Sequence, residues 1–192
     1  MVKQCHLVPQ NQAQQIQQTW SPPQSNQLKI NVDASLDHTS QCFGIGLIIR
    51  DSTGQCRGIR GKYINGRIDP EQAECLAMKE AILWARDCGS NNIILESDCA
   101  NVINSIKTAN PSVQWTNQGL VDEIRLMLSY STYLSVNFVK RTAKNASHVI
   151  ANESRTQRQS FTYLENFPDK FNIAIREDQK FVNLSYVLNF EL

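Results

Sequence analysis

The stretch Leu28-Lys-Ile-Asn-Val-Asp33 alternates apolar and polar side chains, which is the period of a β-strand with one buried face. The next stretch, Cys42-Phe-Gly-Ile-Gly-Leu-Ile-Ile-Arg50, is almost continuously apolar and predicts a second strand. The turn residues Asp51-Ser-Thr-Gly54 separate it from a third predicted strand over residues 55–64. The first part of the fold is therefore expected to be an antiparallel sheet that contains a hairpin.

Downstream of this sheet, helical patterns alternate with further strands. Asp69-Pro70 predicts a helix start, because Asp caps a helix and Pro fits its first position, and Gly89 predicts its end. Ile93-Ile-Leu95 fits a strand buried on both faces, and Leu134–Phe138 alternates as a fifth strand. Three more helices are expected, around residues 102–106, 116–129 and 143–153. The order β-β-β-α-β-α-α-β-α predicts an α/β fold, a mixed sheet flanked by helices.

Three segments are predicted along the chain. Residues 1–27 are expected to be a flexible leader, because the run from Gln10 to Gln18 is polar and of low complexity. Residues 28–155 form the folded domain, and residues 156–192 form a C-terminal extension of uncertain order. Within that extension, residues 181–190 alternate partially, which is compatible with an added strand.

Composition excludes several classes of protein. The chain has 192 residues and a formal net charge of +1, so it is not a globally basic nucleic-acid-packaging protein. No apolar stretch approaches the ~20 residues of a membrane span, and the N-terminus does not read as a secretory signal. The six cysteines form no C-x-x-C pair, which excludes an obvious zinc framework. We therefore expect an intracellular protein of the nucleus or cytoplasm, not secreted and not bound to a membrane.

Three carboxylates occupy informative positions. Asp33 follows the apolar part of the first strand, Glu74 lies in the first turns of the first long helix, and Asp98 follows the Ile-Ile-Leu strand. The ends of neighbouring strands and the start of a helix can converge on one side of a sheet. Carboxylates brought together in this way repel one another unless a cation neutralises them. Hard cations such as Mg²⁺ or Mn²⁺ suit an oxygen-rich cluster of this kind.

Each of these residues also has a purely structural explanation. Asp33 fits the start of a polar loop, Glu74 complements the helix dipole, and Asp98 fits the N-cap of the following helix. Taken one at a time, the structural explanations are favoured. The joint pattern is what favours a metal site.

Seven short motifs that follow one another along the chain resemble one known family. They are Trp20-Ser-Pro-Pro23, Lys29-Ile-Asn-Val-Asp33, Gly44-Ile-Gly-Leu-Ile-Ile-Arg-Asp51, Gln72-Ala-Glu-Cys-Leu-Ala77, Glu80-Ala81, Glu96-Ser-Asp98 and Phe138-Val-Lys-Arg141. This pattern, over about residues 20–155, resembles the plant ribonuclease H-like domain, a reverse-transcriptase-associated type related to type-1 ribonucleases H and retroelements. The resemblance implies a ribonuclease H-like fold with a five-stranded sheet, three strands antiparallel and two parallel. It also implies an endoribonuclease that hydrolyses RNA in RNA–DNA hybrids with two divalent metal ions, Mg²⁺ or Mn²⁺.

The resemblance assigns catalytic and metal-binding roles to four residues. It implies that Asp33 bridges both metal ions, that Glu74 binds one and orients the attacking water, and that Asp98 binds the other. The family's fourth carboxylate follows an Arg-Glu-Ala-Asn-x-x-Ala-Asp-like stretch, and an ungapped alignment places His148 at that position. Imidazole is a softer ligand than carboxylate, so this exchange favours Mn²⁺ over Mg²⁺.

Other features concern the grip on substrate. Lys140, Arg141 and Lys144 form a modest basic patch that is equally compatible with an ordinary solvated helix start. The connector from Lys107 to Thr116 carries no further basic residue, so weak hybrid binding is expected. Trp115 fits either base stacking or a place in the core.

Alternative interpretations stay open at this stage. The first is a catalytically weak or inactive domain of retroelement origin that binds nucleic acid or a protein partner. The second is a relic reading frame with an atypical C-terminal tail. In the leading interpretation the partner is an RNA–DNA hybrid, and the protein is expected to be a monomer.

Overall fold

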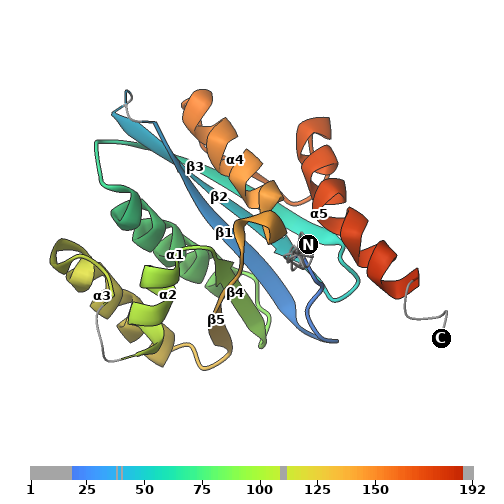
Figure 1. Cartoon of the computed structure of the whole chain (residues 1–192), viewed down its shortest axis with the longest axis horizontal. Helices are drawn as coiled ribbons and strands as arrows, with labels where there is room; N and C mark the ends of the chain where they lie inside the picture. Colours follow the sequence, from blue (N-terminus) through green and yellow to red (C-terminus); the bar gives the residue numbers. More distant parts are fainter. Residues whose placement is uncertain (1–18, 38, 40, 109–111, 188–192) are drawn as a thin grey trace, which may run out of the picture.

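The computed structural model describes residues 19–37, 39, 41–108 and 112–187, and its centre is one six-stranded mixed sheet with the order β5-β4-β1-β2-β3-β6 (Figure 1). The strands are β1 (Leu28–Leu36), β2 (Cys42–Arg50), β3 (Cys56–Asn65), β4 (Ile93–Ser97), β5 (Leu134–Phe138) and β6 (Phe161–Tyr163). The α-helices are α1 (Pro70–Asp87), α2 (Ala100–Lys107), α3 (Gln118–Ser129), α4 (Asn145–Thr156) and α5 (Asp169–Val187). The predicted α/β class and the order of elements over the domain are confirmed.

Strand β1 lies in the interior of the sheet and joins its two halves. It pairs antiparallel with β2, where Asp33 lies opposite Gly46, and parallel with β4, where Ile30 lies opposite Leu95. Strand β5 extends the parallel half, and β3 extends the antiparallel half. Since parallel strands end at the same edge of a sheet, Asp33 near the end of β1 and Asp98 just after β4 are brought to one edge.

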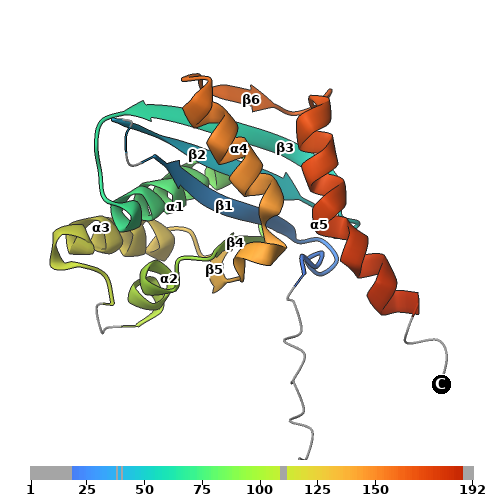
Figure 2. The ribbon, with the colours of Figure 1, turned by 45° about the horizontal axis from the view of Figure 1, so that its top comes forward.

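Helices cover both faces of the sheet. Helix α1, with α2 and α3 against it, packs on one face, and helices α4 and α5 pack on the other (Figures 1 and 2). Ile30 and Val32 of β1 point into the core under α1, where they meet buried residues such as Met78 and Ile82. The alternate β1 residues, among them Asp33, therefore face the α4 side.

Helix α4 lies unusually close to strand β2. A Cβ atom at Gly46 would come within 2.1 Å of the Ser147 carbonyl oxygen, and one at Gly44 within 2.1 Å of the Ala151 carbonyl oxygen. Only glycine permits this approach, because any side chain would push the helix away from the sheet. The Gly-x-Gly pattern of β2 thus sets the height of α4 above the sheet, and with it the position of the residues α4 carries.

The boundaries of α1 follow the predicted signals. The Asp69 side chain accepts a hydrogen bond of 2.9 Å from the Gln72 backbone N–H, and Pro70 occupies the first helical position. Gly89 adopts a positive φ of 64° immediately after the C-cap. The capping interactions therefore fix where α1 begins and, with it, where Glu74 stands.

The structure corrects the predicted ends of the domain. Trp20 is only 2% exposed and packs on Arg50, so the domain begins before residue 28. At the other end, β6 adds a sixth strand beside β3 (Figure 2), and α5 packs against α4, so the domain continues past residue 155. Residues 181–187, part of the segment considered as a possible strand, belong to helix α5. The low-complexity run of the leader and residues 188–192 lie outside the described residues.

Among the described residues, no helix combines the length and apolar character needed to cross a membrane.

Candidate active site

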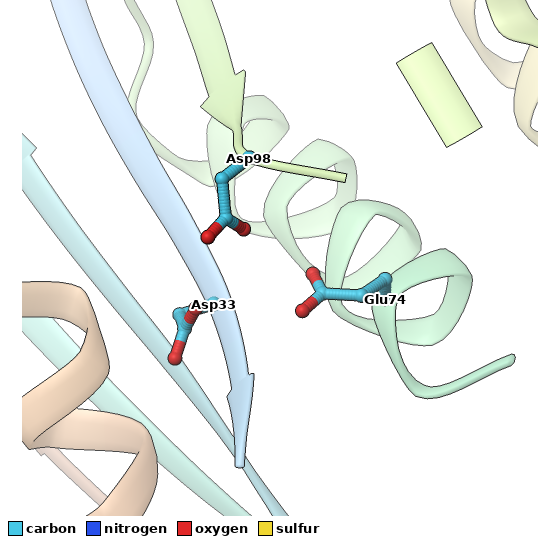
Figure 3. A group of neighbouring side chains, drawn as sticks. All are labelled: Asp33, Glu74 and Asp98. Carbon is cyan, nitrogen blue, oxygen red and sulfur yellow. The ribbon is translucent and has the colours of Figure 1, made fainter. Parts of the chain in front are cut away.

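Asp33, Glu74 and Asp98 meet at one edge of the sheet (Figure 3). Each offers one carboxylate oxygen, and these three oxygens lie within 4.8 Å of one another. Asp33 comes from β1, Glu74 from the second turn of α1, and Asp98 from the residue after β4. The sequence prediction that these residues form one cluster is therefore matched by the geometry.

The structural explanations for the single residues do not account for this arrangement. Asp33 lies within strand β1, not at the start of a loop, and it is only 3% exposed. The N-cap of α2 is Cys99, and among the described contacts no side chain caps that helix, so Asp98 does not serve as its cap. Burial of several carboxylates with no capping role is unfavourable unless a cation compensates them.

The cation present in the structure is the ammonium group of Lys144. The Lys144 side chain is fully buried, and its Nζ contacts the Asp33 carboxylate and lies 2.8 Å from Asp98 Oδ1. Nζ also donates a hydrogen bond of 3.0 Å to the Val32 carbonyl oxygen. Contacts with two carboxylates and one backbone carbonyl therefore hold the ammonium inside the cluster.

His148 approaches the cluster from the same helix. Its Nδ1 lies 2.9 Å from Asp33 Oδ2, and the imidazole is about one-third exposed. The guanidinium of Arg141 lies 3.2 Å from Nε2 of the same ring. The predicted fourth member of the site is thus placed beside Asp33, and both oxygens of Asp33 are engaged by residues of the α4 region.

The members of the site differ in the direction of their pKa shifts. Burial raises the pKa of Glu74 to about 8; Lys144 opposes this shift, and the charges of Asp33 and Asp98 add to it. Burial also acts to raise the pKa of Asp33, but the hydrogen bond from His148 and the charge of Lys144 outweigh it and hold that pKa below 3.8. For Lys144 burial lowers the pKa, and the three carboxylates more than compensate, leaving it above 10.5. Near neutral pH, Asp33 is ionised, Lys144 is charged and Glu74 holds a proton.

The donor set fits a divalent cation. Carboxylate oxygens are the ligands that Mg²⁺ and Mn²⁺ prefer, and the three in the cluster lie within 4.8 Å of one another. Glu74 Oε2 is buried and has no hydrogen-bond partner among the described residues. An oxygen left in this state supplies a lone pair for an incoming cation.

The residues considered for substrate binding are only partly as predicted. Trp115 is 87% exposed, so it is not a core residue and its ring is free to stack on a planar group. Lys140 and Arg141 are exposed near the site. The predicted basic patch is wrong for Lys144, whose charge is turned inward to the carboxylates.

The role of Lys144 is the part of the site that sequence reasoning missed. A signal for it exists, because Lys144 precedes His148 by four residues, and residues at that spacing share one face of a helix. Since His148 is predicted to face the carboxylates, Lys144 at the N-cap of α4 has to be considered there too.

A mixed sheet with helices on both faces and three carboxylates at its edge defines a ribonuclease H-like domain. The chain belongs to the reverse transcriptase-like family, whose model matches residues 31–154. No curated protein sequence matches the chain significantly.

Solved structures share this fold at low sequence identity. An RNase H1 isolated from compost by a metagenomic approach, LC11, superposes with a TM-score of 0.63 at 17% identity, covering 69% of this chain and 98% of its own. The RNase H1 of the halophilic archaeon Halobacterium salinarum superposes with a TM-score of 0.56 at 23% identity, covering 67% and 96%. LC11 in complex with an RNA/DNA hybrid gives a TM-score of 0.61 at 15% identity, covering 68% and 98%.

Proposed function

We propose that this domain binds RNA–DNA hybrids and hydrolyses the RNA strand with the help of a divalent cation, Mg²⁺ or Mn²⁺. The observation that carries the proposal is the convergence of Asp33, Glu74 and Asp98 within 4.8 Å. The family membership and the likeness to an RNase H1 that has been crystallised with a hybrid support the same substrate class.

In this proposal the carboxylates of Asp33, Glu74 and Asp98 hold the cation. When bound, a divalent cation supplies Lewis-acid stabilisation for the charge that develops on the scissile phosphate. Glu74 must release its proton before its oxygens can act as ligands, because its pKa in the metal-free site is about 8. His148 keeps Asp33 in position through the 2.9 Å contact between Nδ1 and Oδ2.

Substrate binding falls to the surface around the cluster. The exposed side chains of Lys140 and Arg141 provide positive charge for phosphate groups. Trp115 offers an exposed ring for stacking. A hybrid is distinguished from duplex DNA by contacts to its 2′-hydroxyl groups. Because few basic residues are available, we expect hybrid binding to be weak, and we expect it to fall with added salt only with the small slope that a few phosphate contacts produce.

The test is cleavage of a labelled RNA–DNA hybrid in Mg²⁺ and, separately, in Mn²⁺. Asp33→Asn is expected to abolish cleavage by removing a ligand while keeping the shape of the side chain. Asp87→Asn makes the same exchange at an Asp of α1 whose side chain is 70% exposed, and it is the control that is expected to leave cleavage intact. A folded protein whose cleavage does not exceed that of Asp33→Asn would refute the proposed activity.

A second candidate is hybrid binding without cleavage, and one observation favours it. Lys144 already neutralises part of the cluster through its contacts with Asp33 and Asp98. Salt-sensitive binding of the hybrid with no products in either metal would support this second function.

A monomeric state and a nuclear or cytoplasmic location stay predictions, which light scattering and imaging of the tagged protein can check.

A further inference from the structure

Lys144 lies inside the acidic cluster, and the proposed hydrolysis gives it no role. It projects from the N-cap of α4 into the cluster, where it is fully buried. Its Nζ contacts Oδ1 of Asp33, in β1, and Oδ1 of Asp98, the residue after the neighbouring parallel strand β4. A cation bound jointly by these two residues would have to occupy the place where the ammonium now lies.

We propose that the ammonium group of Lys144 permanently replaces one of two divalent cations, so that the site binds at most one metal ion. This inference deepens the proposed function, on which it rests for the nature of the ligand. It departs from the two-metal site that the family resemblance implies.

The charge of the cluster supports a single metal ion. With all three carboxylates ionised, the cluster carries three negative charges, and Lys144 reduces this to two, which one divalent cation neutralises. A second divalent cation would leave an excess of two positive charges in a site whose central residues are buried. Such an excess is strongly unfavourable where solvent screening is weak.

The hydrogen bonds of Asp33 point the same way. Both carboxylate oxygens of Asp33 already have a partner, because Oδ1 accepts from Lys144 and Oδ2 contacts His148, so each further cation at Asp33 would compete with one of these contacts. Glu74 differs, because its Oε2 has no partner among the described residues and is available without breaking a contact. One cation can therefore bind on the Glu74 side of the cluster while the ammonium stays on the other side.

The number of bound Mn²⁺ ions tests this inference directly. The full chain is titrated with Mn²⁺, and bound ions are counted by electron paramagnetic resonance, with Asp33→Asn run in parallel to subtract ions bound elsewhere. We expect no more than one ion at the cluster of the wild-type protein. Two ions at the cluster would overturn the inference, whatever the behaviour of any Lys144 variant.

A second arm uses Lys144→Met, which keeps the length of the side chain and removes its charge. We expect this variant to bind one more Mn²⁺ at the cluster than the wild-type protein does. The affinity of the variant for this second ion is expected to be at least about tenfold higher than that of the wild type. Its thermal midpoint is expected to rise with Mn²⁺ by more than that of the wild type. An unchanged ion count in folded Lys144→Met would contradict the proposal.

Lys29→Met is the matched control. Lys29 is also buried, and its Nζ also binds a carboxylate, Glu96 Oε1 at 2.9 Å, and a backbone carbonyl oxygen, that of Ser21 at 2.8 Å. Its loss is expected to lower stability without changing the number of bound Mn²⁺ ions.

The metal count separates this inference from the proposed function. If the wild-type protein cleaves no hybrid but Lys144→Met binds one additional ion, the proposed nuclease activity is refuted and the role of Lys144 is supported. If the wild-type protein cleaves the hybrid and binds two ions at the cluster, the nuclease activity is supported and the role of Lys144 is refuted.

Discussion

Replacing Asp178 by asparagine is expected to loosen the attachment of both C-terminal helices. Asp178 of α5 and Arg50 of β2 form an ion pair of 3.0 Å in which both side chains are fully buried. Asp178 Oδ2 also accepts a hydrogen bond of 3.3 Å from the backbone N–H of Ala146, in the first turn of α4. One carboxylate thus ties α5 to the sheet and to the helix that carries Lys144 and His148.

The expected cost follows from the isolation of Arg50. Loss of one partner of a buried ion pair leaves an uncompensated charge and costs about 3–5 kcal/mol. The contacts of Arg50 with Asn31 Oδ1, at 2.6 Å, and with the ring of Trp20, at 4.0 Å, keep the guanidinium in place without neutralising it. With a shift of roughly 2–4 °C per kcal/mol for a chain of this size, the thermal midpoint of Asp178→Asn falls by about 6–20 °C.

The assay is urea unfolding followed by circular dichroism, with calorimetry for the thermal midpoint. The double variant Arg50→Met with Asp178→Leu removes both charges and is expected to recover most of the loss, because an apolar pair of similar volume avoids the desolvation cost. Glu153→Gln is the control, since Glu153 also links α4 to α5, through Lys170, but at the surface. It is expected to cost less than about 1 kcal/mol. A loss below about 1 kcal/mol for Asp178→Asn would refute this reasoning.

Three further changes test other parts of the structure. Glu74→Gln should stabilise the metal-free protein more at pH 9 than at pH 6, by on the order of 2 kcal/mol, because the ionisation cost is absent below pH 4.5 and complete above about pH 8; equal shifts in thermal midpoint would contradict the raised pKa. Gly46→Ala should cost about 1–3 kcal/mol in urea unfolding, because its Cβ meets the Ser147 carbonyl oxygen at 2.1 Å, whereas Gly119→Ala, with open space around it, should not destabilise. Asp69→Ala should lower the free energy of unfolding by about 1 kcal/mol, because it removes the N-cap of α1. A change within measurement error would show that the cap does not contribute to stability.

Most of the sheet could be predicted because its strands carry strong local patterns. The alternation from Leu28 to Asp33 and the apolar run of β2 both reflect which faces are buried. The start and end of α1 were also predictable, because Asp69, Pro70 and Gly89 act locally.

The ends of the domain could not be predicted in the same way. Trp20 is held by Arg50 and by Asn31, whose Oδ1 accepts its Nε1–H at 3.1 Å, and these partners are distant in sequence. Helix α5 depends on the buried pair between Asp178 and Arg50, which are 128 residues apart. Local sequence patterns do not predict contacts between residues that are far apart along the chain.

The candidate site shows the same division. Asp33, Glu74 and Asp98 could be grouped because each stands at the end of a predictable element. The inward direction of Lys144 depends on how closely α4 lies against β2, and that distance is set by tertiary packing at Gly44 and Gly46. The sequence pattern therefore predicts a solvent-exposed Lys144 in a basic patch, although the side chain is buried.

The contact between Lys144 and the carboxylates also affects folding during synthesis of the chain. Asp33, Glu74 and Asp98 all leave the ribosome before Lys144, which follows Asp98 by roughly 45 residues, or about 2–9 s at ordinary rates of synthesis. During that interval the carboxylates repel one another at the edge of β1 and β4. The nascent sheet therefore gains its internal counter-charge only when α4 arrives, which makes docking of α4 the step that neutralises part of the cluster.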